Sequence, residues 1–84
     1  MKLFVVREVL YDFSSGMVAI KASDMVEARS LFINWLESAL DADTVERYVK
    51  EFDKSIGAGY FHTFELSDTD KNRRGIVTQM WGGS

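Results

Sequence analysis

The first ten residues place apolar side chains on both alternating faces of a strand, and this pattern constrains the fold more than any other feature. The two faces consist of Leu3, Val5 and Val9 on one side and Phe4, Val6 and Leu10 on the other. A strand with one face in water alternates apolar and polar residues, whereas a strand covered on both sides is apolar throughout. We therefore expect residues 2–11 to form an interior strand that is covered on two sides.

Two pairs of strands are predicted, one at each end of the chain. The turn-forming cluster Asp12-Phe13-Ser14-Ser15-Gly16 separates the first strand from a second apolar run over residues 17–22. Near the other end, residues 60–66 alternate aromatic and polar side chains, a polar turn covers 67–75, and a last strand covers 76–81. We expect each pair to form a β-hairpin.

Two helices are predicted between these hairpins. Asp24 with Glu27 three residues later has the spacing of a helix start, and an apolar stripe at helical spacing predicts a helix from about Asp24 to Leu40. Asp43 with Glu46 opens a second, cleaner amphipathic helix, and Gly57 is the expected left-handed residue at its end. The first helix is apolar around more than half of its circumference, so we expect it to contact two neighbouring elements.

The order β-β-α-α-β-β predicts an α+β domain with a four-stranded, mainly antiparallel sheet and both helices on one face. The 84 residues provide for one hydrophobic core, so we expect a single domain over residues 1–84.

Composition narrows the class of protein and its compartment. The chain has no cysteine, which suits a reducing, cytoplasmic compartment. Its first apolar run ends at Arg7 and is too short for a signal peptide or a membrane span. The net charge of −3 argues against a general electrostatic grip on nucleic acid, which needs clustered lysine and arginine.

Residues with catalytic or metal-binding chemistry do not form a recognisable constellation. His62 is the only histidine, and Glu65 falls on the opposite face of the same strand, so the two cannot act as an acid–base pair. The segment Asp68 to Asn72 begins like a calcium loop, but Arg73 replaces its glycine and Gln79 replaces its closing glutamate. We therefore expect a chain that is not an enzyme and uses no cofactor or metal.

The sheet carries more large apolar side chains than two helices can cover, so one of its faces is a candidate interface. The exposed set is either Leu3, Val5, Tyr60, Phe64, Ile76 and Met80 or the alternates Phe4, Val6, Phe61, Val77 and Trp81. Charged residues in two turns are further candidates, an acidic group between the helices and a basic group before the last strand. The predicted partner-binding residues are Trp81, Tyr60, Phe61, Asp41, Asp43, Arg73 and Arg74.

The layout resembles that of small phage-encoded accessory proteins. The resemblance is carried by the strand at the first residues, the turn Ser14-Ser15-Gly16, the strand Met17 to Ala22 and the helix start Ser23-Asp24-Met25-Val26-Glu27-Ala28. Some proteins of that kind inhibit host defences such as CRISPR complexes. The resemblance implies a compact inhibitor that occludes a surface and needs no cofactor.

Three functions stay open at this point. The first hypothesis is a non-catalytic protein-binding module, for example a phage-type inhibitor of a host or viral macromolecular machine. The second is a nucleic-acid-binding module that uses Lys71, Arg73 and Arg74 with strand aromatics such as Tyr60. The third is a homo-oligomeric accessory protein, in which the apolar face is covered by another copy of the chain.

Overall fold

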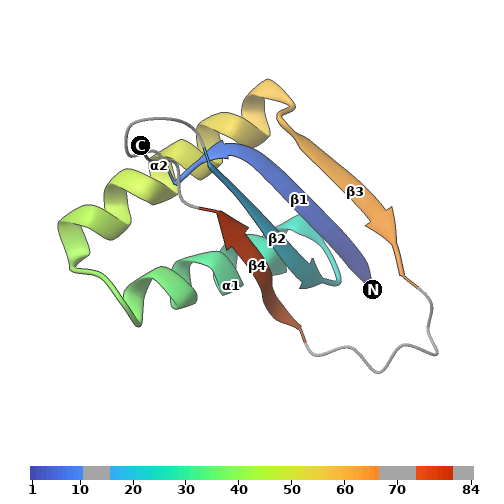
Figure 1. Ribbon diagram of the computed structural model, residues 1–84, viewed down its shortest axis with the longest axis horizontal. Helices are drawn as coiled ribbons and strands as arrows, with labels where there is room; N and C mark the ends of the chain where they lie inside the picture. The colour runs from blue at the N-terminus through green and yellow to red at the C-terminus, as the bar shows by residue number, and fades with distance from the viewer. Residues whose placement is uncertain (11–15, 67–73, 81–84) are drawn as a thin grey trace.

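Four strands and two helices follow one another in the predicted order in a computed structural model, which describes residues 1–10, 16–66 and 74–80 (Figure 1). The elements are β1 (Lys2–Val9), β2 (Gly16–Ala22), α1 (Met25–Glu37), α2 (Ala42–Ala58), β3 (Phe61–Glu65) and β4 (Gly75–Met80). The strands form one antiparallel sheet. The predicted α+β class and element order are therefore confirmed.

The strand order in the sheet is β3-β1-β2-β4. The first predicted hairpin, β1 with β2, is confirmed. The second is wrong, because β3 pairs with β1, β4 pairs with β2, and the two lie at opposite edges (Figure 1). The physical reason is that β1 and β2 have the side chains suited to interior positions, so each takes a second neighbour, while the more polar β3 and β4 form the edges.

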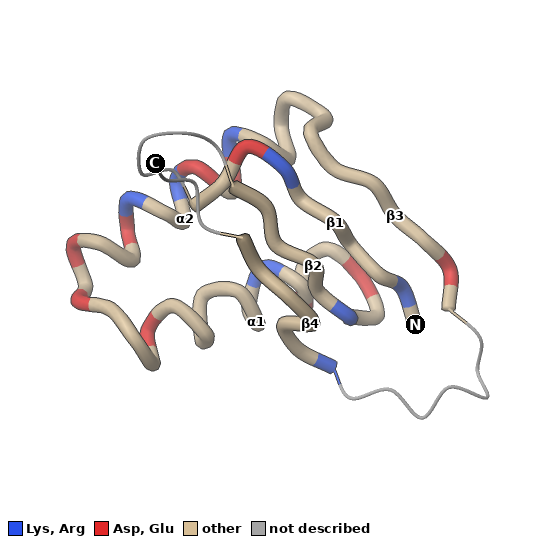
Figure 2. The backbone as a smooth tube through the Cα atoms, in the orientation of Figure 1, with Lys and Arg blue, Asp and Glu red and all other residues tan. Residues whose placement is uncertain are grey.

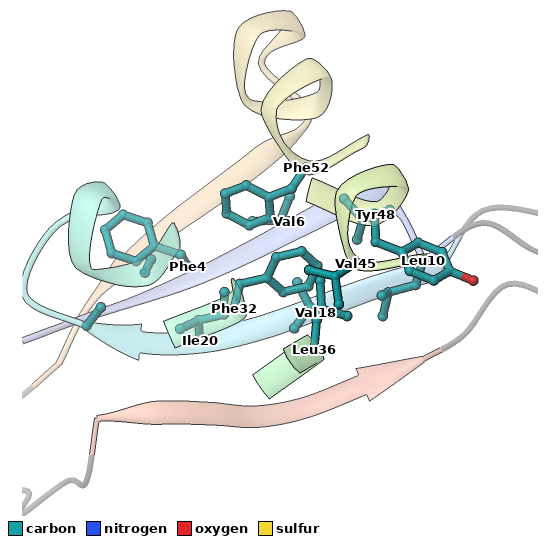
Figure 3. Close-up of a cluster of buried hydrophobic side chains, with 13 residues drawn as sticks. Phe4, Val6, Leu10, Val18, Ile20, Phe32, Leu36, Val45, Tyr48 and Phe52 are labelled. Carbon is teal, nitrogen blue, oxygen red and sulfur yellow. The ribbon is translucent and has the colours of Figure 1, made fainter. Parts of the chain in front are cut away.

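One layered core lies between the sheet and the two helices, which both cover the same face (Figures 1 and 3). Phe4 pairs with Ile20 and Val6 pairs with Val18, and all four side chains are buried against the helices. Val9, Leu10 and Ala22 add to the sheet side of the core, and the helices contribute Ala28, Phe32, Leu36, Val45, Tyr48 and Phe52. The rings of Phe32 and Phe52 stack with centroids 4.7 Å apart, which joins α1 to α2 at the centre of the core.

A β-bulge interrupts β1 between Arg7 and Val9. Glu8 at the bulge has a φ of 60°, in the left-handed region that residues other than glycine rarely adopt. The additional residue resets the alternation of the strand, so Val9 is fully buried in the core cluster. The expectation that Val9 continues the face of Leu3 and Val5 is therefore wrong.

The start of α1 is confirmed, whereas its end and both ends of α2 differ from the expectation. The Asp24 side chain accepts a hydrogen bond from the Glu27 amide at 2.8 Å, and α1 ends at Glu37, before residue 40. The cap of α2 is Asp41 and not Asp43, because the Asp41 carboxylate accepts from the Thr44 amide at 2.8 Å.

The left-handed residue that ends α2 is Gly59, with a φ of 81°, while Gly57 lies inside the helix. The chain has a glycine at both positions, and only the second coincides with the end of the helical hydrogen bonding.

Candidate functional site

The face of the sheet that points away from α1 and α2 is not covered by any described element, and we call it the open face (Figure 1). Its members follow from the register, because residues opposite one another on neighbouring strands share a face. They are Leu3, Val5 and Arg7 of β1, Met17, Ala19 and Lys21 of β2, His62 and Phe64 of β3, and Thr78 and Met80 of β4, with Tyr60 just before β3.

These side chains form three rows across the four strands. Phe64 lies opposite Leu3, which lies opposite Lys21, in the first row. The second row consists of His62, Val5, Ala19 and Thr78. The third row contains Tyr60, Arg7, Met17 and Met80, and the Arg7 guanidinium lies over the Tyr60 ring at 5.8 Å from its centroid. Each row contains a polar or charged side chain, but a stepped apolar path crosses the four strands through Phe64, Leu3, Val5, Ala19, Met17 and Met80.

The large side chains near the edges of the open face are strongly exposed. Tyr60 is 46% exposed, Phe64 52% and Met80 64%. Ala19, in the middle of the sheet, is only 4% exposed because larger neighbours surround its small side chain. The open face therefore combines a filled centre with protruding apolar groups at both edges. Exposed apolar patches are common at the binding sites of small proteins, so the open face is the candidate site.

Ring side chains occupy alternate positions along one edge of this face. Tyr60, His62 and Phe64 form this set, which we call the aromatic ladder. The rings of His62 and Phe64 have centroids 6.5 Å apart and are tilted by 38°. In the described register the charged members of the open face are Arg7 and Lys21, and both are basic. The ladder therefore lies on a face whose charge is opposite in sign to the net charge of the chain.

The structure decides between the two alternative apolar faces. The set that contains Leu3, Val5, Tyr60, Phe64 and Met80 is the open one. Phe4 and Val6, from the alternate set, are buried beneath the helices.

Two residues that the sequence offered as members of an exposed apolar face, Phe61 and Ile76, pack against the core instead. Phe61 lies opposite Val6 and packs against the core, so this predicted binding residue is on the helix side of the sheet. Ile76 lies opposite Ile20 and also packs against the core, so its expected place on the open face is wrong. The bulge in the β2–β4 pairing, which lies beside Ile20, changes the alternation that the sequence suggests there.

The basic residues before β4 are only partly within the described residues. The Arg74 Nε lies 2.9 Å from Glu27 Oε1, which ties the start of β4 to α1. Arg74 therefore forms its ion pair on the helix side of the molecule. Lys71, Arg73 and Trp81 lie outside the described residues, as does the segment Asp68 to Asn72.

The predicted acidic residues lie at the turn between α1 and α2 and not on the open face (Figure 2). The hydrogen bond from the Thr44 amide lowers the pKa of the Asp41 carboxyl below its ordinary range, and this carboxylate caps α2. Asp43 is exposed in the first turn of the helix. The structure therefore does not bring the acidic turn together with the apolar candidates.

Two hollows in the described part of the chain lie mainly away from the open face, and the first shares Tyr60 with it. A cleft of about 480 Å³ is lined by Glu8, Glu51, Lys54, Ser55 and Tyr60. A shallower hollow of about 340 Å³ lies beside the interhelical turn and is lined by Glu37, Leu40, Ala42, Val45 and Glu46. Both have a mixture of carboxylates and apolar or hydroxyl groups.

In residues 1–10, 16–66 and 74–80, no three histidine, cysteine or acidic side chains come together as metal ligands would. His62 is exposed on the open face beside Phe64, and Glu65 is on the opposite side, opposite Lys2. Neither described helix has the length and apolar character required to cross a membrane.

No family model, curated protein or solved structure matches this chain.

Proposed function

We propose, from the geometry alone, that this chain is a non-catalytic protein-binding module whose open face covers an apolar surface of another protein. The observation that carries the proposal is the connected path of apolar side chains that crosses all four strands on the side without helices. The two described helices are both used on the other side of the sheet (Figure 1).

Aromatic anchors and a shape that excludes water are the usual sources of affinity in such an interface. Phe64 and Tyr60 protrude at one edge of the open face, and Met80 protrudes at the other. Burying the exposed half of one such side chain contributes about 1 kcal/mol. Arg7, held against Tyr60, adds a cation that favours a partner with carboxylates around its apolar patch.

A module of this size acts on a larger assembly by occluding a surface. The corresponding function is that of an inhibitor of a host or viral macromolecular machine, as in the small phage-encoded accessory proteins that the layout resembles. Such inhibition needs no chemistry from the bound chain, which agrees with a site made of apolar and aromatic groups.

Matched surface variants test the protein-binding proposal. We expect a partner captured from a lysate by the wild-type chain to be lost with Phe64→Lys on the open face. Capture by Val26→Lys should be unchanged, because Val26 is 77% exposed on α1, on the other side of the molecule. The proposal fails if no captured protein distinguishes the two variants while both retain the wild-type circular dichroism spectrum.

A second function is favoured by one observation, the aromatic ladder beside the basic side chains of the open face. Single-stranded nucleic acids bind to such platforms by stacking their bases on rings and placing phosphates near cations. The probe is a fluorescently labelled oligothymidylate in a titration at low and high salt. Tight binding that weakens steeply with salt and is lost in Phe64→Ala would favour this function over the first. Absence of binding at low salt would exclude it.

A further inference from the structure

The outer edge of β3 has backbone groups that point away from the sheet. The Arg7 amide donates to the Tyr60 carbonyl at 2.8 Å, and the Leu66 amide donates to the Met1 carbonyl at 3.0 Å. In an antiparallel pair the bonded positions alternate, so residues 60, 62, 64 and 66 direct their amides and carbonyls toward β1. Phe61, Thr63 and Glu65 therefore direct theirs outward. No described element lies beyond β3 on that side (Figure 1).

Of the two edges of the sheet, β3 is the one suited to accept another strand. Its five residues pair with β1 in an unbroken register, whereas the pairing of β4 with β2 contains a bulge. Bulges, prolines and central lysines are the usual protection of an edge, and β3 has none of them. Its single charge, Glu65, is at the end of the strand.

The side chains of β3 are also largely uncovered. From His62 to Glu65 every residue is exposed, on the open face and on the helix side alike, and only Phe61 packs against the core. The strand is therefore held to the domain along one edge and at one end. A second strand along its outer edge would satisfy the outward backbone groups and cover the flank of Phe64.

The sequence of β3 fits a second copy of itself. With a two-fold axis at Thr63, Thr63 faces Thr63 of the second copy and Phe61 faces Glu65 of the second copy. His62 then faces Phe64 of the second copy on the open side. Each of the three outward-directed positions exchanges two hydrogen bonds with the residue opposite. No like charges face each other, and threonine and aromatic pairs stabilise antiparallel strands.

We propose that two copies of this chain dimerise through β3, antiparallel about Thr63, into one continuous eight-stranded sheet. The two-fold contact is self-complementary and closed, as in most soluble homodimers. It joins the two open faces into one surface and places the two aromatic ladders side by side at its centre. The contact uses the edge of the sheet, so it leaves the open face free and does not rest on the binding function proposed above.

Charge substitutions at the two-fold axis test the proposal by sedimentation equilibrium over a concentration series. We expect a dimer for the wild-type chain, and an approximately tenfold higher dissociation constant for Thr63→Lys and for Thr63→Glu, because each places like charges opposite each other. An equimolar mixture of the two variants should restore the dimer. Gln79→Lys on β4, the other edge, should dimerise like the wild type.

A covalent trap keeps the test decisive if a charged variant dissociates for another reason. The chain has no cysteine, so Thr63→Cys adds a single thiol at a position where the opposed Cα atoms permit a disulfide. We expect mild oxidation of dilute protein to give a covalent dimer with Thr63→Cys and not with Gln79→Cys. A wild-type chain that is monomeric throughout, or a dimer unaffected by both charged variants, would overturn the proposal.

Discussion

At the scale of single residues, one buried hydroxyl group holds the irregular part of β1 in place. Ser55 is only 3% exposed, and its Oγ donates to the Glu8 carbonyl at 2.8 Å. Glu8 is in the left-handed region, where an L-residue costs about 1–2 kcal/mol. The hydrogen bond from α2 therefore fixes the bulge that turns Val9 into the core.

We expect Ser55→Ala to lower the free energy of unfolding by about 1–2 kcal/mol, because the Glu8 carbonyl loses its partner in a partly buried place. Urea denaturation measures this difference. Ser30→Ala, on the exposed side of α1, is the matched control and should change stability by less than about 0.5 kcal/mol. Equal effects of the two substitutions would mean that the Ser55 hydrogen bond does not stabilise the bulge.

A two-pronged ion pair between the helices gives the stability of the domain a dependence on pH. Arg29 donates to Asp53 through Nε at 2.8 Å and through a terminal nitrogen at 3.0 Å. The hydrogen bond is the main cause of the lowered pKa of Asp53, and the charge of Arg29 adds to it while partial burial opposes it. Because the pKa is lower in the folded chain, the stabilisation is complete above the ordinary aspartate pKa and disappears as pH falls through the folded value.

We expect unfolding free energy to decrease below about pH 4, the ordinary range of aspartate, and Asp53→Asn to make this decrease smaller. At neutral pH the same substitution should cost less than about 1 kcal/mol, because both partners are nearly half exposed to solvent. Thermal melts at several pH values measure both effects. An unchanged pH profile in Asp53→Asn would show that the ion pair does not contribute.

At the scale of elements, the ends of the helices depend on single side chains. Asp41 caps α2, although Asp43 has the more familiar spacing to a glutamate three residues later. Aspartate is a favoured N-cap residue, so both aspartates are suitable caps. The turn that brings the chain from α1 determines which of them is at the N-cap position. A cap is therefore predicted from sequence to within one or two residues.

Replacing the cap should cost more than replacing its neighbour. We expect Asp41→Ala to lower the free energy of unfolding by about 1 kcal/mol, because the Thr44 amide loses its acceptor. Asp43→Ala should cost only a few tenths of a kcal/mol, the value of one carboxylate near a helix start. Chemical denaturation of the two variants side by side decides the assignment, and a larger loss for Asp43→Ala would contradict it.

The elements themselves were predictable from local patterns, and the way in which they pair was not. Helical spacing identified both helices, and β1 is an interior strand of the sheet, but no described element provides the cover that its two-sided apolar alternation predicts for its second face (Figure 1). The pairing of β3 with β1 joins residues that are about sixty positions apart, for which no local pattern exists. The membership of the open face depends in turn on this register and on two bulges, so the sequence left open whether Tyr60 or Phe61 lies on that face.

At the scale of the whole molecule, one core joins every layer, so we expect a single cooperative unfolding transition. Phe32 is fully buried and stacks on Phe52, and Phe32→Ala should cost about 3–5 kcal/mol. That is a large part of the total free energy of unfolding, which is roughly 4–13 kcal/mol for a domain of this size. Circular dichroism and tryptophan fluorescence should report the same lowered midpoint. Two separate transitions would contradict a single core, and Phe64→Ala on the exposed open face serves as the control.

The strand order has a consequence for how the domain is assembled during synthesis. The two central strands come from the first 22 residues of the chain, and both strands that flank them come from residues 61–80. While the ribosome is still adding the helices, both outer edges of the β1–β2 hairpin lack a paired strand. They are paired only when β3 and β4 have been made. Because each closure joins residues far apart in the chain, we expect folding to be slow compared with helical proteins of equal length. During that interval the nascent hairpin is the part of the chain most exposed to aggregation, and a chaperone would protect it best by binding there.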